Sequence, residues 1–251
     1  VHQMQTYDPY EEIPFLAFGA VSGEPHSLEQ CRSLMHFIEA EKFLGVDDRY
    51  RRFLLQLSDR EDLLLETAGV SQAMRRADWS AVRDRLIRAG VWMQLVQNQD
   101  ALLGRLMSGE LSCDLQPINT ALQAIRTRIA ARPTDPLRQV LIAGPLATTE
   151  QDRIYRLLNS MFSNREPDEL LLIAEPGACE HVATYARERY IPMRVFPRDP
   201  AGQLDIEGMV AVASHTYVLT LGGSASEGAE ACYSAALSAG KTAHRVDLEQ
   251  I

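Results

Sequence analysis

Patterns of metal ligands are absent from the 251-residue chain. Its four cysteines form no C-x-x-C pair, and no cluster of His and Cys has the spacing of zinc ligands. We therefore expect no metal site, and nothing in the sequence indicates a cofactor. The cysteines, which we expect to be reduced and mostly buried, are Cys31, Cys113, Cys179 and Cys232.

Signals for export and membrane insertion are also missing. No basic segment followed by an apolar run opens the sequence, so no signal peptide is expected. No apolar stretch approaches the roughly 18 residues needed to span a bilayer. Together with the reduced thiols, these absences predict a cytoplasmic protein with no membrane partner.

Positive charge is scarce. The 25 Lys and Arg against 34 Asp and Glu give a net charge of −9. Affinity for a phosphate backbone comes from clustered Lys and Arg, so a nucleic-acid partner is not expected. The chain has two local basic groups, which we interpret as solvated helix faces. They are Arg49, Arg51 and Arg52, and Arg83, Arg85 and Arg88.

Familiar catalytic and nucleotide motifs are missing too. The chain has no G-x-x-x-x-G-K-[ST] sequence and no G-x-G-x-x-G in the Rossmann position. His181 and His215 have no suitably spaced Asp and Ser partners, so no hydrolase triad is indicated. Any ligand site must therefore be argued from the order of strands, loops and helices.

The chain divides into three segments of different character. Residues 1–26 are punctuated by Pro and Gly, which predicts an irregular segment. Residues 27–132 have apolar side chains at helical spacing, which predicts an all-α domain. The segment 132–136 contains two prolines that break any helix and mark a domain boundary. Strands and helices then alternate over 137–251.

This alternation predicts an α/β domain with a doubly wound parallel sheet of about five strands. The expected strands span residues 139–143, 169–174, 192–196, 217–221 and 242–246. Right-handed crossovers give the strand order 3-2-1-4-5 as the default. The loops that follow the first and fourth strands then flank the switch point, where ligands bind in open α/β sheets.

Those two loops are rich in glycine and hydroxyl residues. The second lies within Thr216–Gly228 (TYVLTLGGSASEG), which predicts a strand, a glycine turn and a helix. Bare backbone and free N–H groups at a helix start suit an anion, although the hydroxyl residues also serve as helix N-caps. The candidate ligand-binding residues are Gly144, Thr148, Thr149, Gly177, Gly222, Gly223, Ser224 and Ser226.

Candidate catalytic groups are few. Glu227 and Glu230 begin the last long helix, where acidic residues are favoured by the helix dipole. Beside a ribose they could accept hydroxyl groups or act as a general base. Cys179, near another helix start, could have a lowered pKa or could simply be a buried packing residue.

With these residues in place, the C-terminal half resembles the SLOG superfamily over about residues 138 to 248. This Rossmann-like group includes the cytokinin-activating LOG phosphoribohydrolases and DprA, and the resemblance is nearest to its DUF2493 (YspA-like) branch. Three stretches carry the resemblance. They are Val140 to Gly144 (VLIAG), Gly177-Ala178-Cys179 with the later Ala186 to Pro192 (ARERYIP), and Leu221 to Ser226 (LGGSAS).

The resemblance implies binding of a nucleotide or nucleotide derivative. It implies that Gly222, Gly223, Ser224 and Ser226 line the phosphate, with Gly144 opposite. The chain departs from the family pattern where Leu146 replaces an arginine and Cys179 replaces an aspartate. The catalytic glutamate of the LOG members falls at Ala229, and Glu230 follows one residue later, rotated by roughly 100° on a helix.

Three functions are compatible with these observations. The first is a nucleotide-binding sensor or regulatory protein whose helical domain contacts a protein partner or a second copy. The second is a nucleotide N-glycosidase or phosphoribohydrolase that uses Glu227 or Glu230. The third is a non-catalytic scaffold that retains the fold with a degenerate ligand site.

Overall fold

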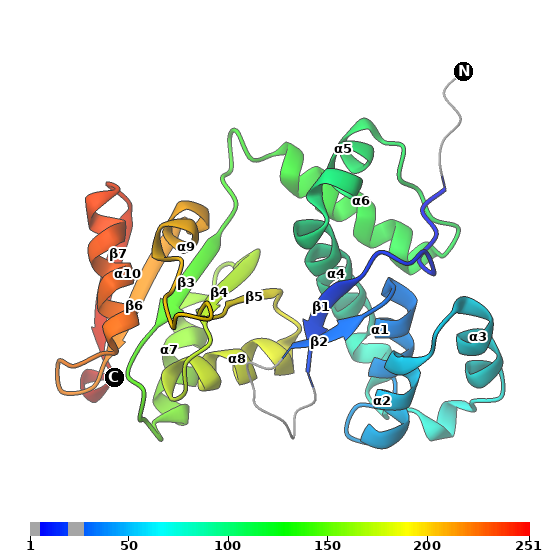
Figure 1. Ribbon diagram of the computed structural model, residues 1–251, viewed down its shortest axis with the longest axis horizontal. Helices are drawn as coiled ribbons and strands as arrows, with labels where there is room; N and C mark the ends of the chain where they lie inside the picture. Colours follow the sequence, from blue (N-terminus) through cyan, green and yellow to red (C-terminus); the bar gives the residue numbers. More distant parts are fainter. Residues whose placement is uncertain (1–5, 20–27) are drawn as a thin grey trace. The chain divides into compact units, whose positions relative to one another are not determined.

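The computed structural model describes residues 6–19 and 28–251 (Figure 1). The chain forms two compact units, and the boundary between them falls at Pro133 and Thr134. This boundary lies in the proline-containing segment 132–136, where each proline removes a backbone donor and restricts the preceding residue.

The N-terminal unit is not all-α. It begins with an antiparallel pair of strands, β1 (Phe15–Phe18) and β2 (Leu28–Cys31), with Phe15 paired to Cys31. Strand β1 lies in the segment expected to be irregular, and β2 lies where a helix was expected. The helix start expected at Ser27, and the other expectations for residues 20–27 and 1–5, lie outside the described residues.

Burial explains why this short hairpin forms. Phe15, Ala17 and Phe18 are buried, and the ring of Phe15 meets Phe37 edge-on at 6.1 Å between ring centroids. Helices follow the hairpin in this unit, and among them α4 packs on β1 and α1 packs on β2. The helices are α1 (Leu34–Glu41), α2 (Asp48–Gln56), α3 (Arg60–Ala68), α4 (Trp79–Gln97), α5 (Gln99–Ser108) and α6 (Gln116–Ala130), with the short 3-10 helix η1 (Gln72–Met74) before α4.

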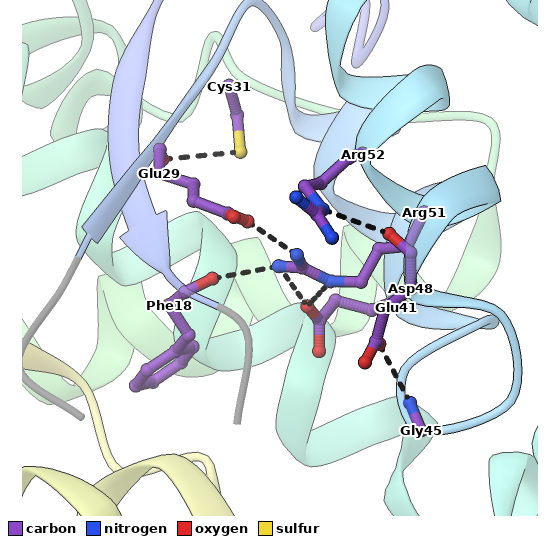
Figure 2. A network of polar contacts seen from close by, with 8 residues as sticks. All are labelled: Phe18, Glu29, Cys31, Glu41, Gly45, Asp48, Arg51 and Arg52. Carbon is purple, nitrogen blue, oxygen red and sulfur yellow. Dashed lines mark hydrogen bonds and ion pairs between the residues drawn. The ribbon is translucent and has the colours of Figure 1, made fainter. Parts of the chain in front are cut away.

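A buried arginine ties the hairpin to the first two helices (Figure 2). Arg51 is 1% exposed, so its interpretation as part of a solvated face was wrong. Its guanidinium donates to Glu29 at 2.5 Å, to Glu41 at 3.1 and 3.2 Å, and to the carbonyl of Phe18 at 3.1 Å. Burial alone would lower the pKa of Arg51, but the charges of Glu41 and Glu29 outweigh it and raise that pKa. The network is a structural tie between β1, β2, α1 and α2.

The C-terminal unit contains the expected parallel sheet. Its strands are β3 (Gln139–Ala143), β4 (Glu169–Ile173), β5 (Met193–Phe196), β6 (His215–Thr220) and β7 (Thr242–Asp247). They are arranged β5-β4-β3-β6-β7, with β3 in the middle (Figure 1). The labels differ from the expected numbering because β1 and β2 belong to the other unit. Counted within this sheet, with β3 as the first strand, the order is 3-2-1-4-5.

Helices cover the sheet in two pairs. Helix α7 (Gln151–Met161) packs with α8 (Ala178–Arg189), and α9 (Ile206–Val212) packs with α10 (Glu227–Ser238). Alternate strand residues such as Leu141 and Leu171 form one core with Met209 of α9 and Cys232 of α10. The intervening strand residues, which point the other way, are buried as well. The chain ends after the 3-10 helix η2 (Leu248–Gln250).

Within the part of the chain that the structure describes, no helix has both the length and the apolar sequence needed to cross a bilayer.

Candidate functional site

A cavity of about 430 Å³ lies at the carboxyl edge of the sheet in the C-terminal unit. We call it the switch-point cleft, because it adjoins the loops after β3 and β6, where the chain reverses its direction of winding. Its volume is within the range of small-molecule sites, about 300–1,000 Å³. The lining residues are Leu146, Ala147, Thr148, Thr149, Glu150, Pro176, Gly177, Glu180 and Leu221.

The loop between β3 and α7 forms one wall of this cleft. Within the described residues, no hydrogen bond engages the N–H groups of residues 146 to 149. Thr148 accepts a hydrogen bond from the amide of Glu150 at 3.1 Å, so its hydroxyl proton remains able to donate. The expectation that Thr148 or Thr149 caps α7 was wrong, because Glu150 is the N-cap residue and makes no side-chain cap. The wall therefore offers several donors to an anion.

Gly177 brings the next loop against this wall. Its φ of +78° favours glycine, and an added Cβ would lie 2.4 Å from the carbonyl oxygen of Pro145. Two amides at the start of α8 are engaged, since Gly177 N–H donates to Glu180 at 3.1 Å and Ala178 N–H donates to Pro145 at 3.0 Å. Gly177 thus shapes the cleft, and its own amide is not available to a ligand.

The lining of the cleft also carries negative charge. Glu180 and Glu150 both line the cleft. Glu150 forms an ion pair with Arg153 at 3.1 Å, and Arg153 also donates to the carbonyl of Leu248 at 3.1 Å. The ring of His181 lies 3.0 Å from the carbonyl oxygen of Thr148 and fixes the loop from outside. Carboxylates of this kind accept hydrogen bonds from hydroxyl groups, so the amides and the carboxylates of the cleft suit different parts of one polar ligand.

The glycine pair after β6 forms a closed turn. Leu221 and Ser224 exchange two backbone hydrogen bonds of 2.9 and 3.1 Å, and Gly222 and Gly223 between them have φ of +59° and +79°. Positive φ at both central residues defines a type I′ hairpin turn. Gly222, Gly223 and Ser224 are exposed, and Leu221 is the residue of this turn that lines the cleft. The glycine pair was expected to line the ligand site, but in the structure it does not line the cleft.

A carboxylate of the chain itself, that of Glu175, lies beside the N-terminus of α10. Ser226 caps the helix by accepting from Ala229 N–H at 3.0 Å, and its hydroxyl donates to Glu175 at 2.7 Å. Arg198 holds the other oxygen of Glu175 at 2.5 Å, and Glu175 is only 3% exposed. A Cβ added to Gly228 would lie 2.8 Å from that carboxylate. Ser226 is thus buried behind the cleft and does not line it.

Other candidates also lie outside the cleft lining. Gly144 is buried, where an added Cβ would lie 2.8 Å from Cβ of Ala178, and its carbonyl accepts from Ser226 N–H at 3.2 Å. Glu230 forms an ion pair with Arg245, and Glu227 is exposed. Burial raises the pKa of Cys179 to about 12, which contradicts the lowered pKa considered for this thiol.

Sequence reasoning missed the acidic residues that define the site. Glu150 and Glu180 were not among the expected ligand residues, although both lie within four residues of one. Glu175 directly follows the buried strand β4 and Ala174, a place where the carboxyl edge of a parallel sheet collects polar side chains. That placement was the available signal for Glu175.

Among the described residues, no group of three or more His, Cys, Asp or Glu side chains is arranged to hold a metal ion. Neither a family model nor a curated protein matches the chain.

Proposed function

We propose that the C-terminal unit binds a nucleotide or a nucleotide-derived small molecule in the switch-point cleft. The observation that carries this proposal is the run of unengaged backbone N–H groups at residues 146 to 149, which line one cleft together with Glu150 and Glu180. The amides bind a phosphoryl group, and the carboxylates accept the ribose hydroxyls. The motif resemblance to the SLOG superfamily supports the same class of ligand.

The proposed phosphate site lies in the loop between β3 and α7, whereas the sequence pointed to the loop between β6 and α10. The sequence pointed to Gly222, Gly223, Ser224 and Ser226, but the amide of Ser224 is engaged within its own turn and Ser226 is buried. The loop between β3 and α7 has donors of the required kind without internal partners. Binding there leaves the helical N-terminal unit as the part through which a sensor or regulatory protein contacts its partner.

Binding without hydrolysis is the function that the side chains support best. Glu227 and Glu230 do not line the cleft, and Glu230 is held by Arg245. A phosphoribohydrolase of the kind considered would use one of these two carboxylates beside the sugar bond, and their positions outside the cleft do not support that reaction. The four free, buried cysteines are compatible with a cytoplasmic setting, which remains part of the proposal.

Calorimetric titration of the full chain with adenosine, adenosine monophosphate and inorganic phosphate tests the proposal. We expect the monophosphate to bind more tightly than either fragment. The substitution Ala147→Glu adds a carboxylate beside the amides and should weaken monophosphate binding by at least about tenfold. The matched control is Ala211→Glu, at an exposed position of α9 near the start of β6.

Three results would contradict this proposal in different ways. Equal weakening by both variants would show that the effect is not local to the cleft. A wild-type chain that binds none of the three compounds would favour the scaffold interpretation, which the internal carboxylate at α10 already favours. Release of free adenine during the titration, detected by chromatography, would establish the hydrolase instead.

A further inference from the structure

Helix α3 of the N-terminal unit carries leucines that its own unit leaves exposed. All nine of its residues are described, and among them only Leu63 is buried, whereas Leu64 and Leu65 are 41% and 75% exposed. One face, at the spacing i, i+3, i+4 and i+7, consists of the exposed residues Glu61, Leu64, Leu65 and Ala68. Adjacent exposed leucines on one helix face mark a contact surface for another molecule.

The same face of α3 is acidic. Glu61 and Asp62 stand one turn before Leu65, so their carboxylates neighbour the most exposed leucine. The one basic residue of the helix, Arg60, is ion-paired with Asp8 at 3.0 Å. A surface that accepts this helix therefore needs an apolar hollow lined by positive charge. We call the following residues the acidic leucine face: Glu61, Asp62, Leu64 and Leu65.

A groove of the opposite charge lies between α4 and α6, which pack against each other (Figure 1). Its volume is about 560 Å³, and Pro117, Ala121 and Ala124 give it an apolar lining of small side chains. Three arginines and one aspartate also line it, so its charge is opposite to that of α3 and to the net charge of the chain, −9. The arginines form the basic group that was interpreted from the sequence as a solvated helix face, namely Arg83, Arg85 and Arg88.

We propose that the acidic leucine face of a second copy of this chain docks in the α4–α6 groove. Leu65 inserts over Ala121 and Ala124, and the neighbouring carboxylates pair with the arginines of the groove. No residue of α3 lines the groove of its own chain, whereas every further copy supplies both complementary surfaces. Reciprocal docking closes a two-fold dimer, and one-way docking continues from copy to copy. This association does not depend on a ligand in the switch-point cleft.

Sedimentation equilibrium of the full chain without ligand, over about a hundredfold range of concentration, tests the proposal. We expect the mass of the wild type to rise with concentration from one chain to two or more. Leu65→Lys keeps a good helix former and places a positive charge against the arginines, so the dissociation constant should rise at least about tenfold.

A matched control changes an exposed leucine of another helix. Leu237, in α10 of the C-terminal unit, is 52% exposed. Leu237→Lys makes the same chemical change away from α3, and it should leave the dissociation constant of self-association at the wild-type value. Circular dichroism confirms that both lysine variants retain the helix content of the wild type.

A second variant tests the groove. Arg88→Glu reverses a charge of its lining and should also weaken self-association at least about tenfold, whereas Arg49→Glu, at an exposed arginine of α2 outside the groove, should not. Mixing Leu65→Lys with Arg88→Glu should restore association, because the first variant keeps an intact groove and the second keeps an intact acidic leucine face.

Three results would overturn the proposal, and none of them affects the proposed ligand site. The first is a wild type that stays monomeric at every concentration. The second is self-association that persists in both Leu65→Lys and Arg88→Glu, because the copies would then meet through other surfaces. The third is a mixture of two monomeric variants that remains monomeric, because α3 and the groove would then not be the two halves of one contact.

Discussion

Two loops at the same edge of the C-terminal sheet have similar residues and place their free backbone amides differently. The loop between β3 and α7 leaves the N–H groups of residues 146 to 149 without internal partners. The loop between β6 and α10 uses amides in the Leu221–Ser224 turn, on Gly144 and in the Ser226 cap. Its amides without internal partners, at residues 222, 223, 225, 227 and 228, belong to residues outside the cleft lining. Glycine and hydroxyl content therefore does not identify an anion site. What matters is which of the donors left after the chain has satisfied its own acceptors lie at a cleft.

The largest expected effect comes from removing the glycine that shapes the open loop. In Gly177→Ala the new Cβ would collide with the carbonyl of Pro145, 2.4 Å away, and the positive φ would be strained. We expect the free energy of unfolding of the C-terminal unit to fall by about 3 kcal/mol. Monophosphate binding should be lost, because the two walls can no longer approach. Urea unfolding followed by circular dichroism, together with calorimetry, measures both effects.

The control variant Gly202→Ala distinguishes the energetic cost of a steric collision from that of backbone strain. Gly202 has the same φ of +78°, but an added Cβ there would meet nothing within 4 Å. This control should therefore lower the free energy of unfolding by only about 1 kcal/mol and leave monophosphate binding unchanged. Similar losses of stability in the two variants would mean that the close contact between Gly177 and Pro145 contributes little.

A smaller effect is expected at the closed loop. Ser226→Ala removes the cap of α10 and a donor to the buried carboxylate of Glu175. We expect the free energy of unfolding to fall by about 2 kcal/mol, from the lost cap and the lost hydrogen bond together. The matched variant Ser224→Ala changes an exposed hydroxyl of the same loop and should stay within about 0.5 kcal/mol of the wild type. If Ser226→Ala and Ser224→Ala lower the free energy of unfolding equally, Ser226 does not stabilise the protein through Glu175.

The sheet was predictable because its signal is local. Five short apolar runs alternate with helical spacing, and the handedness of crossovers restricts the order in which parallel strands can lie. The break around Pro133 is equally local, because proline acts on its own residue and the one before. The closed turn was also within reach of the sequence, since Gly-Gly is a common type I′ pair.

The hairpin, the buried arginine and the occupant of the α10 N-terminus were not predictable in this way. Strand β2 (LEQC) shows no clear apolar alternation, and its pairing with β1 depends on packing against helices distant in sequence. Arg51 lies in a run of charged residues, and only its contacts with Glu41 and Glu29 remove it from solvent. Glu175 reaches Ser226 across 51 positions of sequence. Contacts of this range depend on the tertiary fold, which periodicity does not reveal.

The smallest effect should come from the glycine pair itself, and it gives the sharpest test of the comparison. Gly223→Ala strains a residue with φ of +79° whose added Cβ would meet nothing within 4 Å, so it should cost about 1 kcal/mol of stability. Because the turn is closed and exposed, calorimetry should find monophosphate affinity within about twofold of the wild type. A tenfold loss would instead mean that the phosphate binds after β6, as the sequence first indicated. In that case the amides after β3 would be open only to solvent.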